Sequence, residues 1–389
     1  MTLIFTARCG RVLPIATAFC AVAYWALLRG IAYAAPAPSP SPTPSPAVSV
    51  SAVYTFAAFH TYGINPTGAL DTPTGSDLHA RADITNLLLN LNAVHGRFSA
   101  GATIGEYAFP TLGAALNPTL QAEANTSLYG ALPLVDLTYA PNAHLSISIG
   151  KLATLLGQES AFTYQNVTIE RGTAWALEPT ISRAARLTYT NGPWSAALED
   201  DDGYYSARYG GLQWQIGYAP NTTTNVSFAA ILPRRNATPN ATTGIANKAE
   251  YDFMLSRQIG KLQLEPYLLL VHSPASVTLG YPQNSDASAA VLLGSYALSS
   301  MFSAGFRYEY AHDRPTVNPD GANADLLGYG PGSLAQTFTV TPTYRRGDLF
   351  MRFEFARISL GRFSPGFGFG AQGMQPAQTR IGFEMGVVK

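Results

Sequence analysis

Hydrophobic and polar residues alternate along most of the chain after residue 48, with the two-residue period that is typical of β-strands. The segment ARLTYTNGPWSAALE, residues 185–199, shows this pattern on both sides of an Asn191-Gly192 turn. One parity of this segment carries Leu187, Tyr189, Trp194 and Leu198, and the other carries Arg186, Thr188 and Glu199. The pattern predicts a β-hairpin whose apolar face is hidden from water either by a protein core or by lipid.

The connections between such segments alternate between short and long. Short turns are predicted around His95-Gly96, Pro141-Asn142, Asn191-Gly192, Pro220-Asn221, Ile259-Gly260, Ser299-Ser300 and Arg346-Gly347. Long Gly-, Asn- and Pro-rich connections are predicted at 63–84, 108–130, 152–182, 200–210, 234–248, 273–286, 311–334 and 357–378. This arrangement predicts about 16 antiparallel strands, with short periplasmic turns and long external loops, as in an outer-membrane barrel.

Aromatic residues recur at one height of the predicted strands. Tyr139, Tyr189, Tyr218 and Tyr344 each precede a short turn on the apolar parity, and Trp194 follows one. Amphipathic rings at a common level are typical of the interface between bilayer and water. We therefore predict that the apolar parity faces lipid and that the sheet closes on itself, because an open edge would leave backbone groups unpaired in hydrocarbon.

The N-terminus predicts export. Residues 1–35 combine Arg8 and Arg11 with an apolar run and small residues before a cleavage site near Ala34 or Ala35, which indicates a signal peptide. An uncleaved anchor helix is the alternative. Residues 36–47, PAPSPSPTPSPA, predict an extended periplasmic linker, and residues 48–389 the barrel. Both cysteines, Cys9 and Cys20, lie in the leader, so we expect no disulfide in the mature protein.

Composition and motifs argue against several other classes of protein. The chain has 24 basic and 24 acidic residues, a net charge of zero, and only 12% charged residues, so nothing indicates nucleic acid as a partner. Gly-x-Ser-x-Gly and phosphate-binding loop motifs are absent, and GFGFGAQG at 366–373 is predicted to be a flexible loop. The His144 and Ser146 pair is only a weak candidate for a barrel enzyme. We predict no enzyme activity and no cofactor.

The histidines and the acidic residues are the candidate metal ligands of the chain. The six histidines lack metal-ligand spacing, so no metal site is predicted from them. The sequence EDDDG at 199–203 offers Asp200, Asp201 and Asp202 as oxygen ligands, but its spacing does not match a calcium-binding loop. We expect a solvated external loop there and leave a bound ion open.

Residues 150–205 resemble a known family. Their sequence is GKLATLLGQESAFTYQNVTIERGTAWALEPTISRAARLTYTNGPWSAALEDDDGYY, and it is similar to the OmpL-like porins, the second β-barrel porin family. The resembling positions are Gly150, Gly157, Glu159, Asn166, Arg171, Glu178-Pro179, Tyr189 and Gly192-Pro193. The resemblance implies a channel and no catalytic residues. The chain departs from most outer-membrane barrels by ending in Lys389 rather than an aromatic residue, so Phe383 or a different signal is expected to direct assembly.

The sequence therefore predicts an all-β transmembrane barrel in the outer membrane that is a porin, a passive channel for small hydrophilic solutes or ions. Its partners would be the lipid bilayer and the solutes, and whether it forms a homo-oligomer is left open. A structural or adhesive barrel without an open pore and a barrel enzyme are the alternatives.

We predict that the long connection 152–182 folds inward and narrows the pore. The candidate constriction residues are Glu159, Glu170, Arg171 and Glu178 on this connection and Arg186, Arg307, Arg352 and Arg380 on the lumen wall. Acids facing permanently charged arginines would set up a field across the constriction. In a competing interpretation these arginines pair with neighbouring wall acids, for instance Arg307 with Glu309.

Overall fold

The computed structural model describes residues 47–65, 79–116, 129–207, 209–234, 248–275, 283–314 and 325–389. The chain divides into two units, Met1–Pro44 and Ser45–Lys389, and only the second contains described residues. The predicted signal peptide and most of the predicted linker therefore lie outside the described residues. Among the described residues, no helix has the length and apolarity needed to cross a bilayer.

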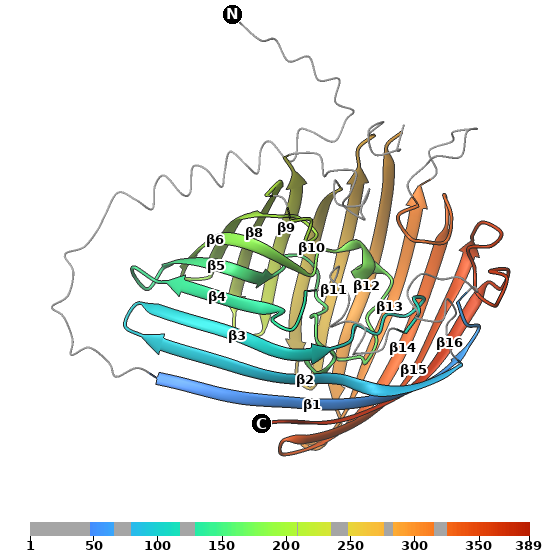
Figure 1. Ribbon diagram of the computed structural model, residues 1–389, viewed down its shortest axis with the longest axis horizontal. Helices are drawn as coiled ribbons and strands as arrows, with labels where there is room; N and C mark the ends of the chain where they lie inside the picture. Colours follow the sequence, from blue (N-terminus) through green and yellow to red (C-terminus); the bar gives the residue numbers. More distant parts are fainter. Residues whose placement is uncertain are drawn as a thin grey trace, which may run out of the picture. The chain divides into compact units, whose positions relative to one another are not determined.

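Sixteen β-strands and two short 3₁₀ turns form the described fold (Figure 1). The strands are β1 (Ala47–Tyr62), β2 (Ala80–His95), β3 (Phe98–Tyr107), β4 (Leu134–Tyr139), β5 (Leu145–Ala153), β6 (Ile181–Asn191), β7 (Trp194–Asp201), β8 (Gly211–Asn221), β9 (Thr224–Pro233), β10 (Ala249–Ile259), β11 (Leu262–Ser273), β12 (Ser285–Ala297), β13 (Phe302–Arg314), β14 (Leu334–Arg346), β15 (Leu349–Arg362) and β16 (Ala377–Val388). The 3₁₀ turns η1 (Thr163–Gln165) and η2 (Ala174–Leu177) both lie between β5 and β6.

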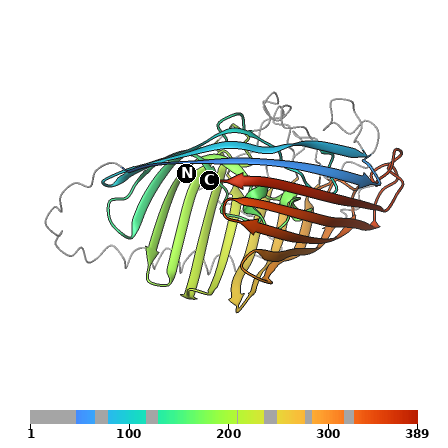
Figure 2. The ribbon, with the colours of Figure 1, turned by 90° about the horizontal axis from the view of Figure 1, so that it is seen from below.

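The strands form one closed antiparallel barrel, in which each strand pairs with its neighbours in sequence and β1 pairs with β16 (Figure 2). The closing register runs from Val53 opposite Val388 to Tyr62 opposite Thr379. Closure gives every strand two partners, so no sheet edge is left to face hydrocarbon. The predicted barrel of about 16 strands is confirmed.

Short and long connections alternate as predicted, which places all short turns at one end of the barrel and all long connections at the other. Gly96, Gly192, Gly260 and Gly347 occupy tight turns with φ between +56° and +60°, a conformation that glycine adopts without steric cost. Three strands extend beyond their predicted ends by more than two residues. Strands β2, β13 and β15 extend into the predicted loops 63–84, 311–334 and 357–378, because pairing with neighbouring strands continues there despite weaker alternation in sequence.

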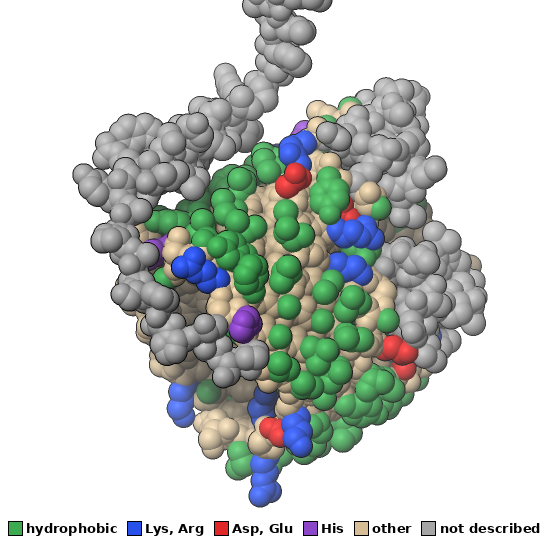
Figure 3. Space-filling model, turned by 60° about the vertical axis from the view of Figure 1, so that its left-hand side comes forward, with side chains coloured by type: hydrophobic (Ala, Val, Ile, Leu, Met, Phe, Trp, Pro, Cys, Tyr) green, Lys and Arg blue, Asp and Glu red, His purple; other side chains and the backbone are tan. Residues whose placement is uncertain are grey.

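The outer surface of the barrel is apolar, as the alternation predicted. Trp194, Leu198 and Phe353 are exposed, whereas their neighbours in the sequence Glu199 and Arg352 are buried on the inner face. Hydrophobic side chains predominate on the described part of the face in Figure 3, and charged side chains are few. Such an exposed apolar surface fits contact with lipid tails.

Aromatic rings meet in pairs at the short-turn end. The ring centroids of Phe98 and Tyr139 are 4.9 Å apart, and those of Trp194 and Tyr218 are 4.5 Å apart. Phe302 and Tyr344, also in register, are 5.0 Å apart. The aromatic level predicted from sequence is therefore confirmed, and each ring pair joins adjacent strands where they approach their turns.

Part of the barrel interior is a packed apolar core. It combines wall residues with residues of the long connections, including Leu112, Leu177, Leu326 and Phe369. These connections belong to the long-loop end, so they fold back into the barrel rather than standing away from it. The interior is consequently divided between this core and a polar region.

Candidate functional site: the barrel lumen and its inserted loop

The connection 154–180, here called the inserted loop, enters the barrel. It contains η1 and η2, and in Figures 1 and 2 it is the green segment with short helical ribbon inside the ring of strands. Its residues Phe162, Ile169 and Leu177 are at most 1% exposed. The connection therefore folds into the barrel, as predicted.

Wall carboxylates hold the backbone of the inserted loop. The Glu354 carboxylate accepts hydrogen bonds from the amides of Ile169 (2.5 Å) and Glu170 (2.9 Å). The Glu309 carboxylate accepts from the amides of Thr173 (2.8 Å) and Ala174 (3.2 Å). A loop without regular structure leaves amides unpaired, and buried amides need acceptors. The lumen-facing acids of β13 and β15 supply them.

Two buried ion pairs connect the inserted loop to the wall. Arg307 Nη1 lies 2.9 Å from Glu159 Oε1, and Arg380 Nη1 lies 2.7 Å from Glu170 Oε1. All four side chains are at most 1% exposed, so the pairs are in direct contact rather than separated by a water-filled gap. Burial raises the pKa of the Glu159 carboxyl, and the nearby Arg307 guanidinium opposes that rise.

Two other candidate arginines pair with acids of the wall. Arg186 lies 2.5 Å from Glu199 on the neighbouring strand, and Arg352 lies 2.5 Å from Glu384. Arg352 also donates to the carbonyl oxygens of Asn166 (2.8 Å) and Thr163 (2.7 Å) in the inserted loop. Arg307 has both kinds of partner, because it contacts Glu159 of the inserted loop and also lies 3.9 Å from Glu309 of its own strand. The loop acids and wall arginines touch directly, so the expected field between charges on opposite sides of an open constriction is not what these pairs form.

The guanidinium group of Arg171 packs near two aromatic rings. Its guanidinium carbon lies 5.3 Å from the centroid of Phe109 and 5.4 Å from that of Trp175, within the range of cation–π attraction. Its Nε donates to the carbonyl of Ser160 at 3.2 Å. The side chain is fully buried, and its contacts with Ser160 and Trp175 connect two parts of the inserted loop.

Small residues allow the inserted loop to lie against its acidic partners. A Cβ on Gly172 would come within 1.8 Å of Glu309 Oε1, and a Cβ on Gly157 within 2.0 Å of Glu178 Oε2. Asn166 closes the loop on itself, because its side chain accepts from the Ser160 amide at 2.7 Å and donates to the Ser160 carbonyl at 2.8 Å. These contacts give a physical role to Gly157 and Asn166, two of the family-like positions.

The sequence EDDDG is not the solvated loop that we expected. Glu199 and Asp201 belong to β7 and are buried on the lumen side, and Asp202 is 1% exposed. Asp202 pairs with Arg183 at 2.7 Å, and Asp200 pairs with Arg234. Strand β7 continues to Asp201 because β6 and β8 pair with it there, so the acids alternate between faces instead of forming one exposed cluster.

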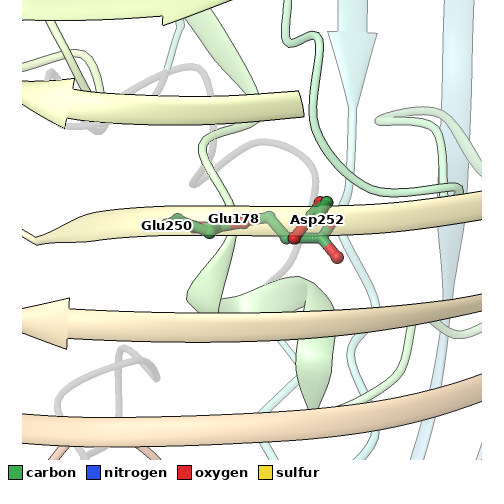
Figure 4. Close-up of side chains that lie close together, drawn as sticks. All are labelled: Glu178, Glu250 and Asp252. Carbon is green, nitrogen blue, oxygen red and sulfur yellow. The ribbon is translucent and has the colours of Figure 1, made fainter. Parts of the chain in front are cut away.

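Glu178 lies apart from the other candidates, with two acids that the sequence analysis missed. Its carboxylate meets those of Glu250 and Asp252, and one oxygen from each lies within 4.8 Å of the others (Figure 4). Burial and then the neighbouring Asp252 raise the pKa of Glu178 well above its usual range. Lys248, just before β10, is the nearby basic residue, and burial lowers its pKa to about 8. In the sequence, the i, i+2 spacing of Glu250 and Asp252 was the feature that could have placed both acids on one face of a strand.

A polar cavity of about 260 Å³ lies at the short-turn end of the lumen. Tyr164, Asn166 and Val167 of the inserted loop line one side, and wall residues such as Arg345 and Arg352 line the other. The inserted loop therefore bounds a hollow that opens toward the short turns.

Comparison with known proteins assigns the family. The family model described as "Putative beta-barrel porin-2, OmpL-like" matches residues 46–388. The chain belongs to this family. It is an outer-membrane porin, a β-barrel channel for passive diffusion. The resemblance predicted from residues 150–205 is confirmed.

Solved structures with the same architecture support the fold at low sequence identity. The outer-membrane channel DcaP of Acinetobacter baumannii has a TM-score of 0.59 and 12% identity, covering 88% of this chain and 97% of that one. The anion-selective porin from Comamonas acidovorans gives 0.58 and 12%, with coverage of 89% and 100%. The trimer form of OmpT from Vibrio cholerae gives 0.56 and 10%, with coverage of 89% and 100%. No curated protein matches the sequence.

The structure places His144, one member of the weak enzyme candidate. His144 lies in the short turn between β4 and β5, and its Nδ1 is hydrogen-bonded to the backbone carbonyl of Thr190 at 2.8 Å. The glycine-rich 366–373 segment lies in the connection between β15 and β16, as predicted.

Proposed function

We propose that this porin conducts small ions and small hydrophilic solutes through a lumen narrowed by the inserted loop. The observation that carries the proposal is the loop's path, bound to the wall by the Glu159–Arg307 and Glu170–Arg380 pairs and by Glu309 and Glu354. A segment held inside a barrel at several points reduces the free cross-section and excludes large solutes. Solutes would move down their own gradients, so the activity requires neither a cofactor nor a catalytic residue.

We further propose a preference for cations. Among the described residues, twelve acids but only five basic residues are buried. The acids are Glu159, Glu170, Glu178, Glu199, Asp201, Asp202, Glu250, Asp252, Glu309, Asp313, Glu354 and Glu384, and the bases are Arg171, Lys248, Arg307, Arg352 and Arg380. Arg186 and Arg183 pair with Glu199 and Asp202 and are less buried, and the acids still outnumber the bases when these two arginines are counted. An excess of acid along a pore of low dielectric attracts cations and repels anions. The relative from Comamonas acidovorans is described as anion-selective, so this chain would differ from it.

A barrel with a structural or adhesive role is the second candidate, favoured by the apolar core inside the lumen. Current through a planar bilayer distinguishes the two, because a barrel filled by packed side chains carries none. The purified porin should give discrete conductance steps. Deletion of residues 160–175 should increase the step size, because it removes the centre of the inserted loop.

The selectivity proposal is tested by the reversal potential under a salt gradient. Wild type should favour cations, and Glu159→Gln with Glu170→Gln should shift the ratio of permeabilities toward anions. Asp348→Asn, in the exposed short turn between β14 and β15, is the matched control and should leave the ratio unchanged. If neither the deletion nor the double substitution alters current or selectivity, the inserted loop does not line the pore.

Oligomeric state is a separate proposal. The Vibrio cholerae OmpT structure is described as a trimer form, and we propose a homo-oligomer for this barrel. Chemical cross-linking in outer-membrane fractions should give a ladder that ends at one defined multiple of the chain mass. A single monomer band at all cross-linker concentrations would contradict it.

A further inference from the structure

Three carboxylates from two segments meet inside the barrel at its long-loop end. Glu250 and Asp252 project from the first residues of β10 on the lumen side, and Glu178 follows η2 at the end of the inserted loop. In Figure 4 the Glu178 side chain lies between the other two. One oxygen of each carboxylate lies within 4.8 Å of the others. Calcium binds oxygens at about 2.3–2.6 Å, so all the ligand oxygens of one ion lie within about 5.2 Å of one another, and these three carboxylates meet that condition.

The hydrogen bonds of these carboxylates leave oxygens without partners. Asp252 Oδ2 accepts from the Gly157 amide at 2.6 Å, and Glu250 Oε2 accepts from the Tyr204 hydroxyl at 3.0 Å. The unpartnered atoms are Glu178 Oε1, Glu250 Oε1 and Asp252 Oδ1. Their residues are 5%, 0% and 0% exposed. Buried carboxylate oxygens without donors are costly unless a cation or a proton joins them.

The nearby Lys248 does not fill the centre of the cluster. Its ammonium lies 4.6 Å from the centroid of the Tyr204 ring, and Lys248 Nζ is itself without a hydrogen-bond partner. Three carboxylates and one ammonium have a formal charge of −3 + 1 = −2, which one divalent cation balances. The donors are all hard oxygens, which select calcium or magnesium over transition metals.

We propose that Glu178, Glu250 and Asp252 bind a calcium ion that clamps the end of the inserted loop to β10. The site is distinct from the ion pairs with Arg307 and Arg380, which fix the middle of the loop to β13 and β16. Calcium rather than magnesium is favoured because magnesium usually keeps several waters and binds through one or two carboxylates, whereas calcium accepts several carboxylates in flexible geometry. The long-loop end faces the external medium in barrels of this class, where calcium is supplied.

Calcium binding is measured on the whole barrel, refolded in detergent and stripped with a chelator. Isothermal titration calorimetry with calcium chloride should show one ion per chain, and millimolar calcium should raise the melting temperature by at least about 3 °C. Glu250→Gln with Asp252→Asn should weaken binding at least about tenfold and abolish the temperature shift. Asp313→Asn is the matched control, because Asp313 is equally buried and also has unpartnered oxygens but lies on β13. It should bind calcium as wild type does.

Other outcomes overturn the site. If wild type binds no calcium and the double variant is the more stable protein at every calcium concentration, the carboxylates share protons instead. If magnesium binds as tightly as calcium, the assignment of the ion is wrong. If the double variant does not refold, titration and melting of the wild type alone decide. None of these measurements requires an open pore, so their failure and the failure of the channel proposal are distinguishable.

Discussion

Individual lumen-facing acids of this porin act as acceptors for backbone amides as much as partners for arginines. Glu354 receives two loop amides and the Thr341 hydroxyl (2.8 Å), and Glu309 receives two loop amides and the Thr337 hydroxyl (2.6 Å). A carboxylate has about four lone-pair sites and no donor, so it suits a cluster of N–H and O–H groups. A residue of the same shape that carries a donor would fit poorly.

Glu354→Gln tests this role. The amide replaces one acceptor with a donor that faces the N–H of Ile169 or Glu170, and we expect a loss of about 1–3 kcal/mol locally. Hydrogen exchange of these two amides should accelerate about tenfold for each 1.4 kcal/mol lost. Asp136→Asn on β4 is the control, since Asp136 accepts from Thr138 on its own strand. Equal protection of the two loop amides in wild type and Glu354→Gln would show that Glu354 does not anchor the loop.

The two faces of a strand should respond differently to a charge. Ile149 is 62% exposed on the outside of β5, and Ser148 is its lumen-side neighbour. Ile149→Arg should cost about 2–4 kcal/mol if it lies near the bilayer midplane, whereas Ser148→Arg should cost less because the lumen is polar. Urea titration of refolded barrel in lipid vesicles measures both. Arg186→Leu is less suitable as a lumen control, because it would leave the buried Glu199 without its arginine.

Alternation in sequence was sufficient to assign most side chains to a face, but not to assign their partners. Arg307 and Glu309 were correctly placed on one face because the strand period is two. That Arg307 contacts Glu159, 148 residues away, depends on the path of an irregular loop, which has no period to read. Glu178 lies on the same irregular loop, so its proximity to Glu250 and Asp252 could not be predicted either.

At the level of elements, the lengths of the connections were sufficient to predict the order and direction of the strands. Seven short turns and eight long connections alternate because antiparallel strands joined in sequence reverse at opposite ends. Length alone did not distinguish the inserted loop from the other long connections. Its acids predicted contact with the arginines of the wall, whereas its glycines and the amide acceptors on β13 and β15 became interpretable only with the structure.

The orientation of the elements in the membrane is tested by single cysteines. The printed sequence has cysteine only at Cys9 and Cys20, both in the predicted leader. Gln372→Cys in the exposed connection between β15 and β16 should react with an impermeant maleimide on intact cells, because long loops face outward. Asn191→Cys in a short turn should react only after the outer membrane is opened. The reverse labelling pattern would invert the orientation.

For the whole molecule, closure between the first and last strands determines whether the barrel can exist in lipid. Strands β1 and β16 join residues far apart in sequence, and the last rungs pair Tyr54 with Val387 and Val53 with Val388. Lys389 adds two backbone hydrogen bonds with Ala52, at 2.8 and 2.9 Å. These bonds use only the main chain. The backbone of residue 389 is therefore more important for closure than the identity of its side chain.

Deletion of residues 386–389 should therefore prevent folding, whereas Lys389→Ala should not. The deletion removes the β16 partners of residues 52–55 of β1, and each amide or carbonyl left unpaired costs several kcal/mol where hydrocarbon excludes water. Refolding into detergent, followed by electrophoresis with and without heating, should show a compact band for wild type and Lys389→Ala but not for the deletion. Refolding without cellular factors isolates closure from recognition by the assembly machinery. If the deleted chain refolds in detergent but fails to reach the outer membrane in cells, residues 386–389 belong to an assembly signal, and closure tolerates the loss of the strand pairs that they form.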